Sequence, residues 1–247
     1  MRVSLTVAYE GTNYHGWQVQ PNNITIESVL NQALSDLLGE PVVVAGASRT
    51  DAGVHAMGNV AIFDTNTRIP AEKISYALNQ RLPADIVVQE SKEVAATFHP
   101  RHCNSKKMYE YRILNRKFRD PLKRYNTFFY YYDLDVKQMQ MAAKYLVGEH
   151  DFRSFCSVHA CVETTVRTVY ALDVDKKDDV VTIRICGSGF LYNMVRIIAG
   201  TLLQVGSGVI GPEQVKYILG QKDRAAAGPT APACGLTMMG IVFEGAD

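Results

Sequence analysis

The sequence predicts an α+β protein made of two related halves that divide near residue 105. Several segments alternate apolar and polar residues, which is typical of antiparallel strands with one buried face. Other segments carry apolar residues at helical spacing, and both halves arrange strands and helices in a similar order. The 247 residues suffice for one large domain or two small ones. We expect an N-terminal domain over residues 1–104 and a C-terminal domain over residues 105–247.

In the first half, residues 2–9 alternate and predict a strand. Thr25 is suited to cap a helix whose apolar positions recur up to residue 38, and Gly39 is suited to end it. Residues 46–57 are polar, contain glycine and predict a loop. The other elements expected here are strands over 41–45, 58–64 and 85–89, and a helix from Pro70 to about Arg81.

In the second half, residues 107–114 alternate and predict a strand with Tyr109 and Tyr111 on one face. Asp135 is suited to cap a helix that runs to about residue 147. A hairpin is expected around residues 176–179. The other elements expected here are strands over 127–132, 165–174, 180–186 and 235–243, and helices over 191–205 and 212–219, the last closed by Gly220.

Hydrophobic residues make up 47% of the chain and charged residues 21%, which is typical of a soluble globular protein. No apolar run approaches the roughly 20 residues that cross a bilayer. The N-terminus alternates instead of showing a signal peptide's basic start and apolar block. We therefore expect a cytoplasmic protein without membrane association.

Five unevenly spaced cysteines argue against a disulfide framework. Cys156, His159 and Cys161 lie close together in sequence, but no CxxC pair accompanies them. We therefore expect no metal site.

The formal net charge is only +1, yet residues 99–125 carry nine basic and two acidic side chains. That band has a charge of +7, which leaves −6 for the rest of the chain. A concentrated basic band is a plausible footprint for a phosphate backbone. A solvated loop explains the same charge equally well, so charge alone does not separate the two interpretations.

The loop over residues 46–56 has the most unusual composition, because it places Ser48, Arg49, Thr50 and Asp51 in succession. Asp-x-Gly commonly forms a turn for purely local reasons. Here the loop follows a predicted buried strand, and loops at strand ends often carry reactive side chains. Asp51 is therefore a candidate catalytic carboxylate.

Arg196 interrupts an otherwise apolar helix. Its stem can lie along apolar surface while the guanidinium reaches water. If the helix is packed on several sides, the buried cation requires a carboxylate partner. Asp51 is our candidate, and an arginine partner would keep it ionised and oriented. A separation beyond about 8 Å would rule out the pair.

Tyr109 and Tyr111 alternate within a lysine-containing strand. Such residues usually form sheet core, but aromatic faces beside cations also stack unpaired bases. The sequence does not decide between these roles. Motifs for dinucleotides, phosphate loops and nucleophile elbows are missing from the chain. His55, His99 and His102 have no metal or triad spacing, and we expect polar surface or supporting roles for them.

Residues 48–56 resemble the catalytic motif of the tRNA pseudouridine synthase A (TruA) family. Four further segments resemble the family's other motifs in the expected order: residues 9–18, 98–109, 189–196 and 231–236. The resemblance covers essentially the whole chain. Pro100 and Cys103 depart from the alanines that we expect there, but both lie outside the Asp51 motif.

The resemblance implies a pseudouridine synthase fold, with two related α/β halves whose antiparallel sheets form a central cleft. It implies an isomerase that converts uridine to pseudouridine at positions 38, 39 and 40 of the tRNA anticodon stem-loop. The enzyme would break the N1–C1′ bond, turn the uracil and rejoin it through C5. It would need no cofactor and would act as a homodimer whose tRNA lies across both subunits.

Among the residues, Asp51 matches the family's essential aspartate, and Tyr109 matches the tyrosine that stacks on the target base. Arg196 matches the arginine that pairs with the aspartate, and Arg49 matches one that helps to hold the base out of the stem. Two more candidate substrate-binding residues lie in the same motifs: His55 and Lys107.

Three alternatives remain open. A hydrolytic N-glycosidase usually requires a pair of carboxylates, and the Asp51 loop offers one. A non-catalytic RNA-binding protein would bind RNA without any reaction that depends on Asp51. A synthase of the same family that modifies other tRNA positions is the third.

Overall fold

The computed structural model describes residues 1–157 and 163–244. The chain folds into two compact units. Unit 1 comprises Met1–Ser105 together with the C-terminal segment from Met238, and unit 2 comprises Lys106–Thr237. The predicted domains, 1–104 and 105–247, stay a prediction.

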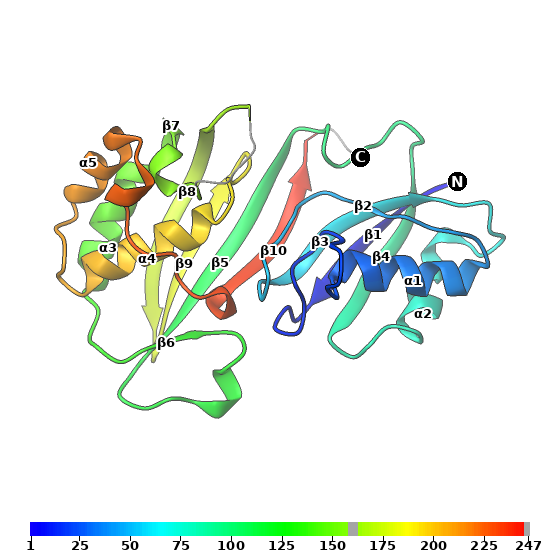
Figure 1. Ribbon diagram of the computed structural model, residues 1–247, viewed down its shortest axis with the longest axis horizontal. Helices are drawn as coiled ribbons and strands as arrows, with labels where there is room; N and C mark the ends of the chain where they lie inside the picture. Colours follow the sequence, from blue (N-terminus) through cyan, green and yellow to red (C-terminus); the bar gives the residue numbers. More distant parts are fainter. Residues whose placement is uncertain (158–162, 245–247) are drawn as a thin grey trace. The chain divides into compact units, whose positions relative to one another are not determined.

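Unit 1 is an antiparallel sheet accompanied by two helices (Figure 1). Its elements are β1 (Arg2–Tyr9), α1 (Ile26–Leu38), β2 (Ala45–Gly46), β3 (His55–Asp64), α2 (Ala71–Asn79), β4 (Ile86–Val94) and the part of β10 (Leu236–Phe243) that follows Thr237. The strand order is β4-β1-β3-β10, and β1 is antiparallel to β4 and β3. Six of the eight β1 residues are buried, as befits a central strand.

Local signals define α1 as predicted. The Thr25 side chain accepts a hydrogen bond from the Ser28 amide, and the Ser28 side chain accepts one from the Thr25 amide, which completes a capping box. Gly39 ends the helix in a left-handed conformation with φ 69°.

The strand predicted over residues 41–45 is wrong, because only Ala45–Gly46 pairs with β3. Val42 and Val44 are buried, which explains the strand-like pattern. Their amides donate to the side chains of Ser35 and Asn31 on α1 instead of to a neighbouring strand. A sequence pattern reports burial but does not identify these side-chain acceptors.

Within unit 2, antiparallel strands follow the order β5-β9-β8-β7, and short β6 is parallel to β5. Its strands are β5 (Ser105–Asn115), β6 (Phe128–Tyr130), β7 (Gly148–Asp151), β8 (Val166–Lys177) and β9 (Val180–Gly187). Its α-helices are α3 (Val136–Ala143), α4 (Met194–Gly206) and α5 (Gln214–Gln221). Its 3-10 turns are η1 (Pro121–Lys123), η2 (Lys144–Leu146), η3 (Arg153–Phe155), η4 (Arg224–Ala226) and η5 (Ala233–Gly235).

Two details of unit 2 differ from the sequence prediction. Strand β7 was not predicted, because Gly148–Asp151 is polar and lacks an apolar alternation. Helix α5 continues through Gly220 to Gln221, and its C-cap is Lys222, a non-glycine residue with φ 54°. Helix α4 matches its apolar pattern closely and has eleven buried residues.

No helix in the described ranges is long and apolar enough to cross a membrane. The four cysteines within these ranges form no disulfide there. His159 and Cys161, which belong to the cluster considered in the sequence, lie outside the described residues. Among the residues that are described, no group of three or more His, Cys, Asp or Glu side chains is arranged to hold a metal ion.

Candidate active site

Asp51 lies in the loop that connects β2 to β3 in unit 1. The loop leaves the sheet at Ala47, whose amide donates to the Val60 carbonyl at 2.7 Å. It turns back where the Val54 amide donates to the Asp51 carbonyl at 3.1 Å, and Gly53 takes a φ of 77°. The Asp-x-Gly turn expected on local grounds is thus present, and it places the half-buried Asp51 at the turn's first position.

A buried polar network holds the residues just before Asp51. Tyr9 on β1 shares a 2.8 Å hydrogen bond with the Thr50 hydroxyl. Asn59 on β3 is wholly buried, and its Nδ2 donates to the Ser48 carbonyl at 3.0 Å and to the Tyr9 oxygen at 3.5 Å. Leaving a buried partner of this kind unsatisfied costs about 1–3 kcal/mol. The network therefore fixes the loop from two neighbouring strands.

The segment before α1 packs directly against the same loop. The Trp17 amide donates to the Thr50 carbonyl at 3.1 Å, and the Gly53 amide donates to the Tyr14 carbonyl at 3.2 Å. Gly16 has φ 83°, and a Cβ at this residue would lie only 2.4 Å from the Thr50 carbonyl oxygen. Two distant sequence segments approach this closely because the contact residue is glycine.

His55 begins β3 and is 5% exposed, so it supports the loop from inside instead of lying at the surface. Its Nδ1 accepts a hydrogen bond from the Gly11 amide at 3.0 Å. That bond places the ring proton on Nε2 in the neutral form. A Glu10 carboxylate oxygen also lies 3.3 Å from Nδ1. Arg49, by contrast, is exposed on the loop.

In unit 2, Tyr109 lies on β5 opposite Ile185 of β9. It is 7% exposed and packs edge-to-face against Phe190, with ring centroids 5.2 Å apart. Tyr111, two residues along the same face, is wholly buried and donates to the Pro232 carbonyl at 2.8 Å. Tyr111 is therefore sheet core. The role of Tyr109 as a stacking platform stays a prediction.

Arg196 lies in the first turn of α4 and is half-buried. Its Nε donates to the Ala231 carbonyl and its Nη1 to the Asn193 side-chain oxygen, both at 2.8 Å. Asn193 itself has φ 60° and donates to the Ser157 hydroxyl at 2.9 Å. Asparagine is among the non-glycine residues that adopt this left-handed conformation most readily. Two acceptors of unit 2 thus orient the guanidinium.

The candidate residues divide between the two units. Asp51, Arg49 and His55 belong to unit 1, whereas Tyr109, Arg196 and Lys107 belong to unit 2. The predicted pairing of Arg196 with Asp51 would join the units, and it stays a prediction. Lys107 is half-buried on β5 opposite Gly187.

Sequence reasoning missed the side chains that position these candidates. Asn59 lies on β3 in a strand of mostly apolar residues, and an isolated buried amide is the signal that marks it. Asn193 and Ala231 lie in two of the segments that resemble family motifs. The Ala231 carbonyl that accepts from Arg196 lies 35 residues further along the chain. Sequence periodicity does not predict a contact at that separation.

Comparison with known proteins matches residues 5–102 and 142–244 to a family model described as tRNA pseudouridine synthase. The tRNA pseudouridine synthase A of Thermoanaerobacter sp. (strain X514) is 50% identical over 98% of this chain and 99% of its own length. That of Bacillus subtilis (strain 168) is 46% identical over 99% of this chain and all of its own length. A solved Cbf5-Nop10-Gar1 complex matches at 14% identity with a TM-score of 0.33, a likeness too low to support an argument.

Proposed function

The chain belongs to the tRNA pseudouridine synthase family, and we propose that it modifies uridines 38, 39 and 40 of the anticodon stem-loop with Asp51 as its catalytic carboxylate. Membership of the family confirms the predictions of a pseudouridine synthase fold and of an isomerase that converts uridine to pseudouridine in tRNA. The observation that carries the proposal is the position of Asp51, half-buried on a loop that a buried network fixes. A carboxylate acts efficiently only when it is held in place.

The isomerisation requires no redox partner or group donor. The N1–C1′ bond breaks, a C5–C1′ bond forms, the proton on C5 leaves and N1 gains one, so atoms and charge balance within the nucleotide and solvent. One carboxylate has three routes available: addition to the sugar, addition to the uracil ring, or removal of a sugar proton. We assign Asp51 to the reacting centre without choosing among these routes.

The target uridine is stacked in RNA, so it has to be extruded before it reacts, at a cost of a few kcal/mol. We propose Tyr109 as the ring that stacks on the uracil, because Lys107 precedes it by two residues on the same face of β5. Arg49 supports the extruded base from its exposed place on the loop. Arg196 orients Asp51 and keeps it ionised. His55 and Lys107 complete the proposed substrate-binding set.

The decisive experiment compares the wild-type chain with Asp51→Asn on tRNA transcripts that each carry a single uridine at position 38, 39 or 40. We expect pseudouridine at each position with the wild type, and none with the variant, while both bind tRNA. Wild-type product levels from Asp51→Asn would refute the catalytic assignment.

Mass spectrometry separates the alternatives in the same samples. Isomerisation leaves the RNA mass unchanged, whereas an N-glycosidase releases free uracil. A binding protein without activity would give neither product. Pseudouridine that forms only outside positions 38–40 would assign the chain to other tRNA positions.

We also propose that the chain acts as a cytoplasmic homodimer. The resemblance to the TruA motifs supports the dimer, and a tRNA substrate is available in the cytoplasm. Light scattering of the purified chain at micromolar concentration is expected to give about twice the 27.4 kDa chain mass. A monomer mass for the free chain, together with one chain per tRNA in the complex, would contradict this expectation.

A further inference from the structure

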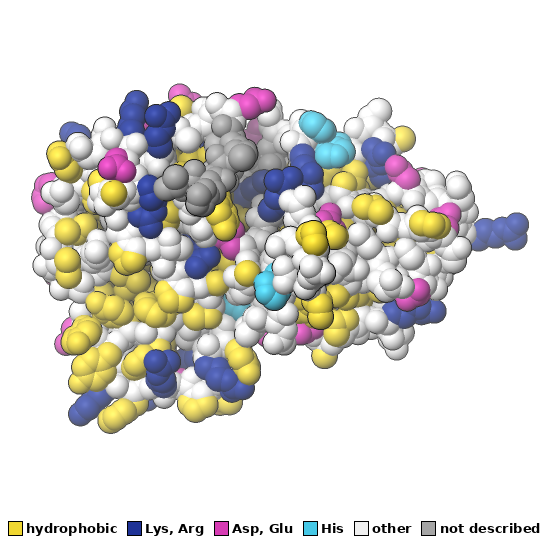
Figure 2. Space-filling view, viewed as in Figure 1, with side chains coloured by type: hydrophobic (Ala, Val, Ile, Leu, Met, Phe, Trp, Pro, Cys, Tyr) yellow, Lys and Arg dark blue, Asp and Glu magenta, His cyan; other side chains and the backbone are white. Residues whose placement is uncertain are grey.

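The segment between β5 and β6 combines positive charge with exposed apolar side chains. We call residues 116–125 the basic loop. It carries five basic residues against one acidic residue, Asp120. Leu122 is 93% exposed, Phe118 67% and Tyr125 46%. Figure 1 shows this loop projecting from unit 2, and Figure 2 shows blue and yellow side chains gathered on it.

Local hydrogen bonds shape the basic loop in advance. The Asp120 side chain accepts from the Leu122 amide at 3.0 Å and caps η1. The Lys123 amide donates to the Asp120 carbonyl, and the Thr127 hydroxyl donates to the Lys123 carbonyl at 2.7 Å. Leu122 is therefore presented outward by an organised turn. A preformed surface loses little conformational entropy when it binds.

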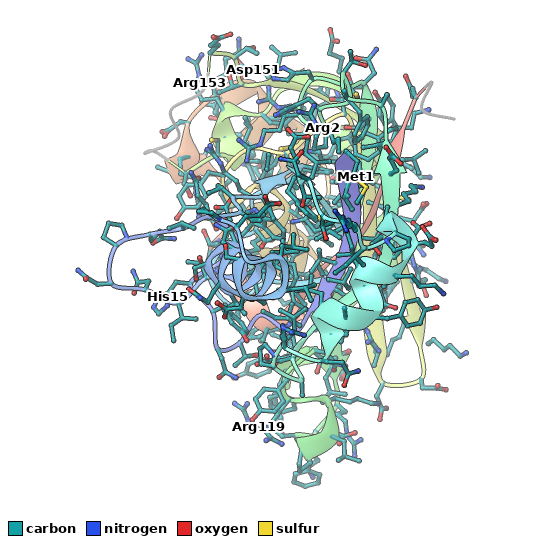
Figure 3. The ribbon with its side chains drawn as sticks, turned by 90° about the vertical axis from the view of Figure 1, so that its right-hand side faces the viewer. Met1, Arg2, His15, Arg119, Asp151 and Arg153 are labelled. Atoms are coloured by element: carbon teal, nitrogen blue, oxygen red, sulfur yellow. The ribbon has the colours of Figure 1, made fainter. Side chains whose placement is uncertain are left out.

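Cations and aromatic rings lie against one another along the loop. The Arg119 guanidinium lies 4.8 Å from the centroid of the Phe129 ring, and that of Arg124 lies 4.0 Å from the Tyr125 ring. Lys117 lies over Phe118 at 5.5 Å. Figure 3 shows Arg119 extending from the loop beside η1. Guanidinium planes and aromatic rings are the surfaces on which unpaired bases stack, and the charges suit phosphates.

The charge of the basic loop decides between two kinds of partner. A two-fold contact centred on the loop would bring together two segments that each carry five basic residues against one acidic residue, which is unfavourable. Two of the five, Arg116 and Lys123, have carboxylate neighbours at 3.2 and 3.8 Å, and neither ion pair is buried. A polyanion with stackable bases complements both the charge and the exposed rings.

The loop lies well away from Tyr109 along the same strand. Arg116 follows Tyr109 by seven residues, which corresponds to roughly 20 Å of extended strand. If Tyr109 stacks on the target uracil, the basic loop contacts a different part of the RNA. Such a contact exists equally before and during the reaction, so it changes KM and leaves kcat nearly unchanged.

We propose that the basic loop is a second tRNA-binding surface, which holds phosphates and an unpaired base away from the modified uridine. This inference rests on the proposed tRNA-modifying function.

The test replaces Arg119 and Arg124 together by glutamine, and Phe118 by alanine in a separate variant. The matched control replaces Lys137 and Lys216 by glutamine, because both are exposed in unit 2 outside the loop. For each protein, kcat and KM for tRNA are measured at several salt concentrations, and tRNA affinity is measured directly by filter binding. Thermal unfolding checks that each variant folds.

We expect the double arginine variant to raise KM and Kd about tenfold or more, with kcat within twofold. The slope of log Kd against log salt should fall by roughly 1.5, as two phosphate contacts are lost. Phe118→Ala should weaken binding about fivefold or more without changing that slope, because a stacking contact carries no charge. The control should match the wild type.

Loop variants that match the control in KM, Kd and salt slope would overturn the proposal. So would a wild-type dimer that becomes monomeric in the Phe118→Ala variant, because a second copy would then cover the loop. Filter binding keeps this inference separate from the proposed function. If the wild-type chain makes no pseudouridine but the loop variants bind tRNA more weakly than it does, the proposed function is refuted and the second tRNA-binding surface is supported.

Discussion

Replacing Gly16 by alanine tests whether the position of the Asp51 loop limits catalysis. The added Cβ would lie 2.4 Å from the Thr50 carbonyl oxygen, one residue before Asp51. The two segments have to separate by about 1.0–1.6 Å to reach an ordinary contact of 3.4–4 Å. A displacement of about 1 Å at a catalytic group lowers the rate by roughly 10²-fold. We therefore expect kcat for tRNA to fall about 100-fold.

Gly39→Ala is the matched control, because Gly39 also has a positive φ, of 69°, but has nothing within 4 Å of its Cβ position. Both variants incur a left-handed backbone penalty of about 1–2 kcal/mol, so both should lower Tm by roughly 2–8 °C. Only Gly16→Ala should lower kcat. The measurements are single-turnover pseudouridine formation and thermal unfolding. A Gly16→Ala rate within threefold of the Gly39→Ala rate would refute the reasoning.

Two further predictions concern unit 1. Asn59→Ala removes the donor to the Ser48 carbonyl, so we expect a loss of about 1–3 kcal/mol in unfolding free energy and a kcat decrease at unchanged KM. Unchanged Tm and kcat would contradict this role. The hydrogen-bonded Arg2 guanidinium holds the pKa of Asp64 below its usual value of 3.8. Stability from this pair is present above pH 3.8 and is lost as pH falls through the lower folded pKa. Asp64→Asn should therefore lower Tm near neutral pH and converge with the wild type at acid pH, whereas parallel Tm curves would speak against the pair.

The sequence predicts elements well where their signals are local. The capping box at Thr25 and the left-handed Gly39 bound α1 within a residue of expectation, and the alternation over β1 and β5 locates those strands. Prediction fails where partners come from elsewhere. Val42 and Val44 look like a strand because they are buried, but their amides bind α1 side chains.

The same distinction applies to the candidate site. The Asp51 turn forms from neighbouring residues, so the sequence locates it and the structure retains it. The side chains that hold it come from other strands, and Tyr9 is 41 residues away from Thr50. No periodicity identifies such a bond. For Arg196, the sequence predicts a carboxylate partner, with Asp51 as the candidate, but it does not identify Asn193 or the Ala231 carbonyl.

The divided composition of unit 1 has a consequence for synthesis of the chain on the ribosome. Residues from Met238 onward supply the strand beside β3, yet they are translated after all of unit 2. Until then, β2 pairs with only Ala61 and Ile62 on this edge of β3, and the rest of the edge, which begins at His55 beside the Asp51 turn, stays open. We expect chains that terminate early to aggregate or be degraded, because an open strand edge invites intermolecular pairing. Synthesis of β10 thus completes the sheet of unit 1 only after unit 2 has been translated.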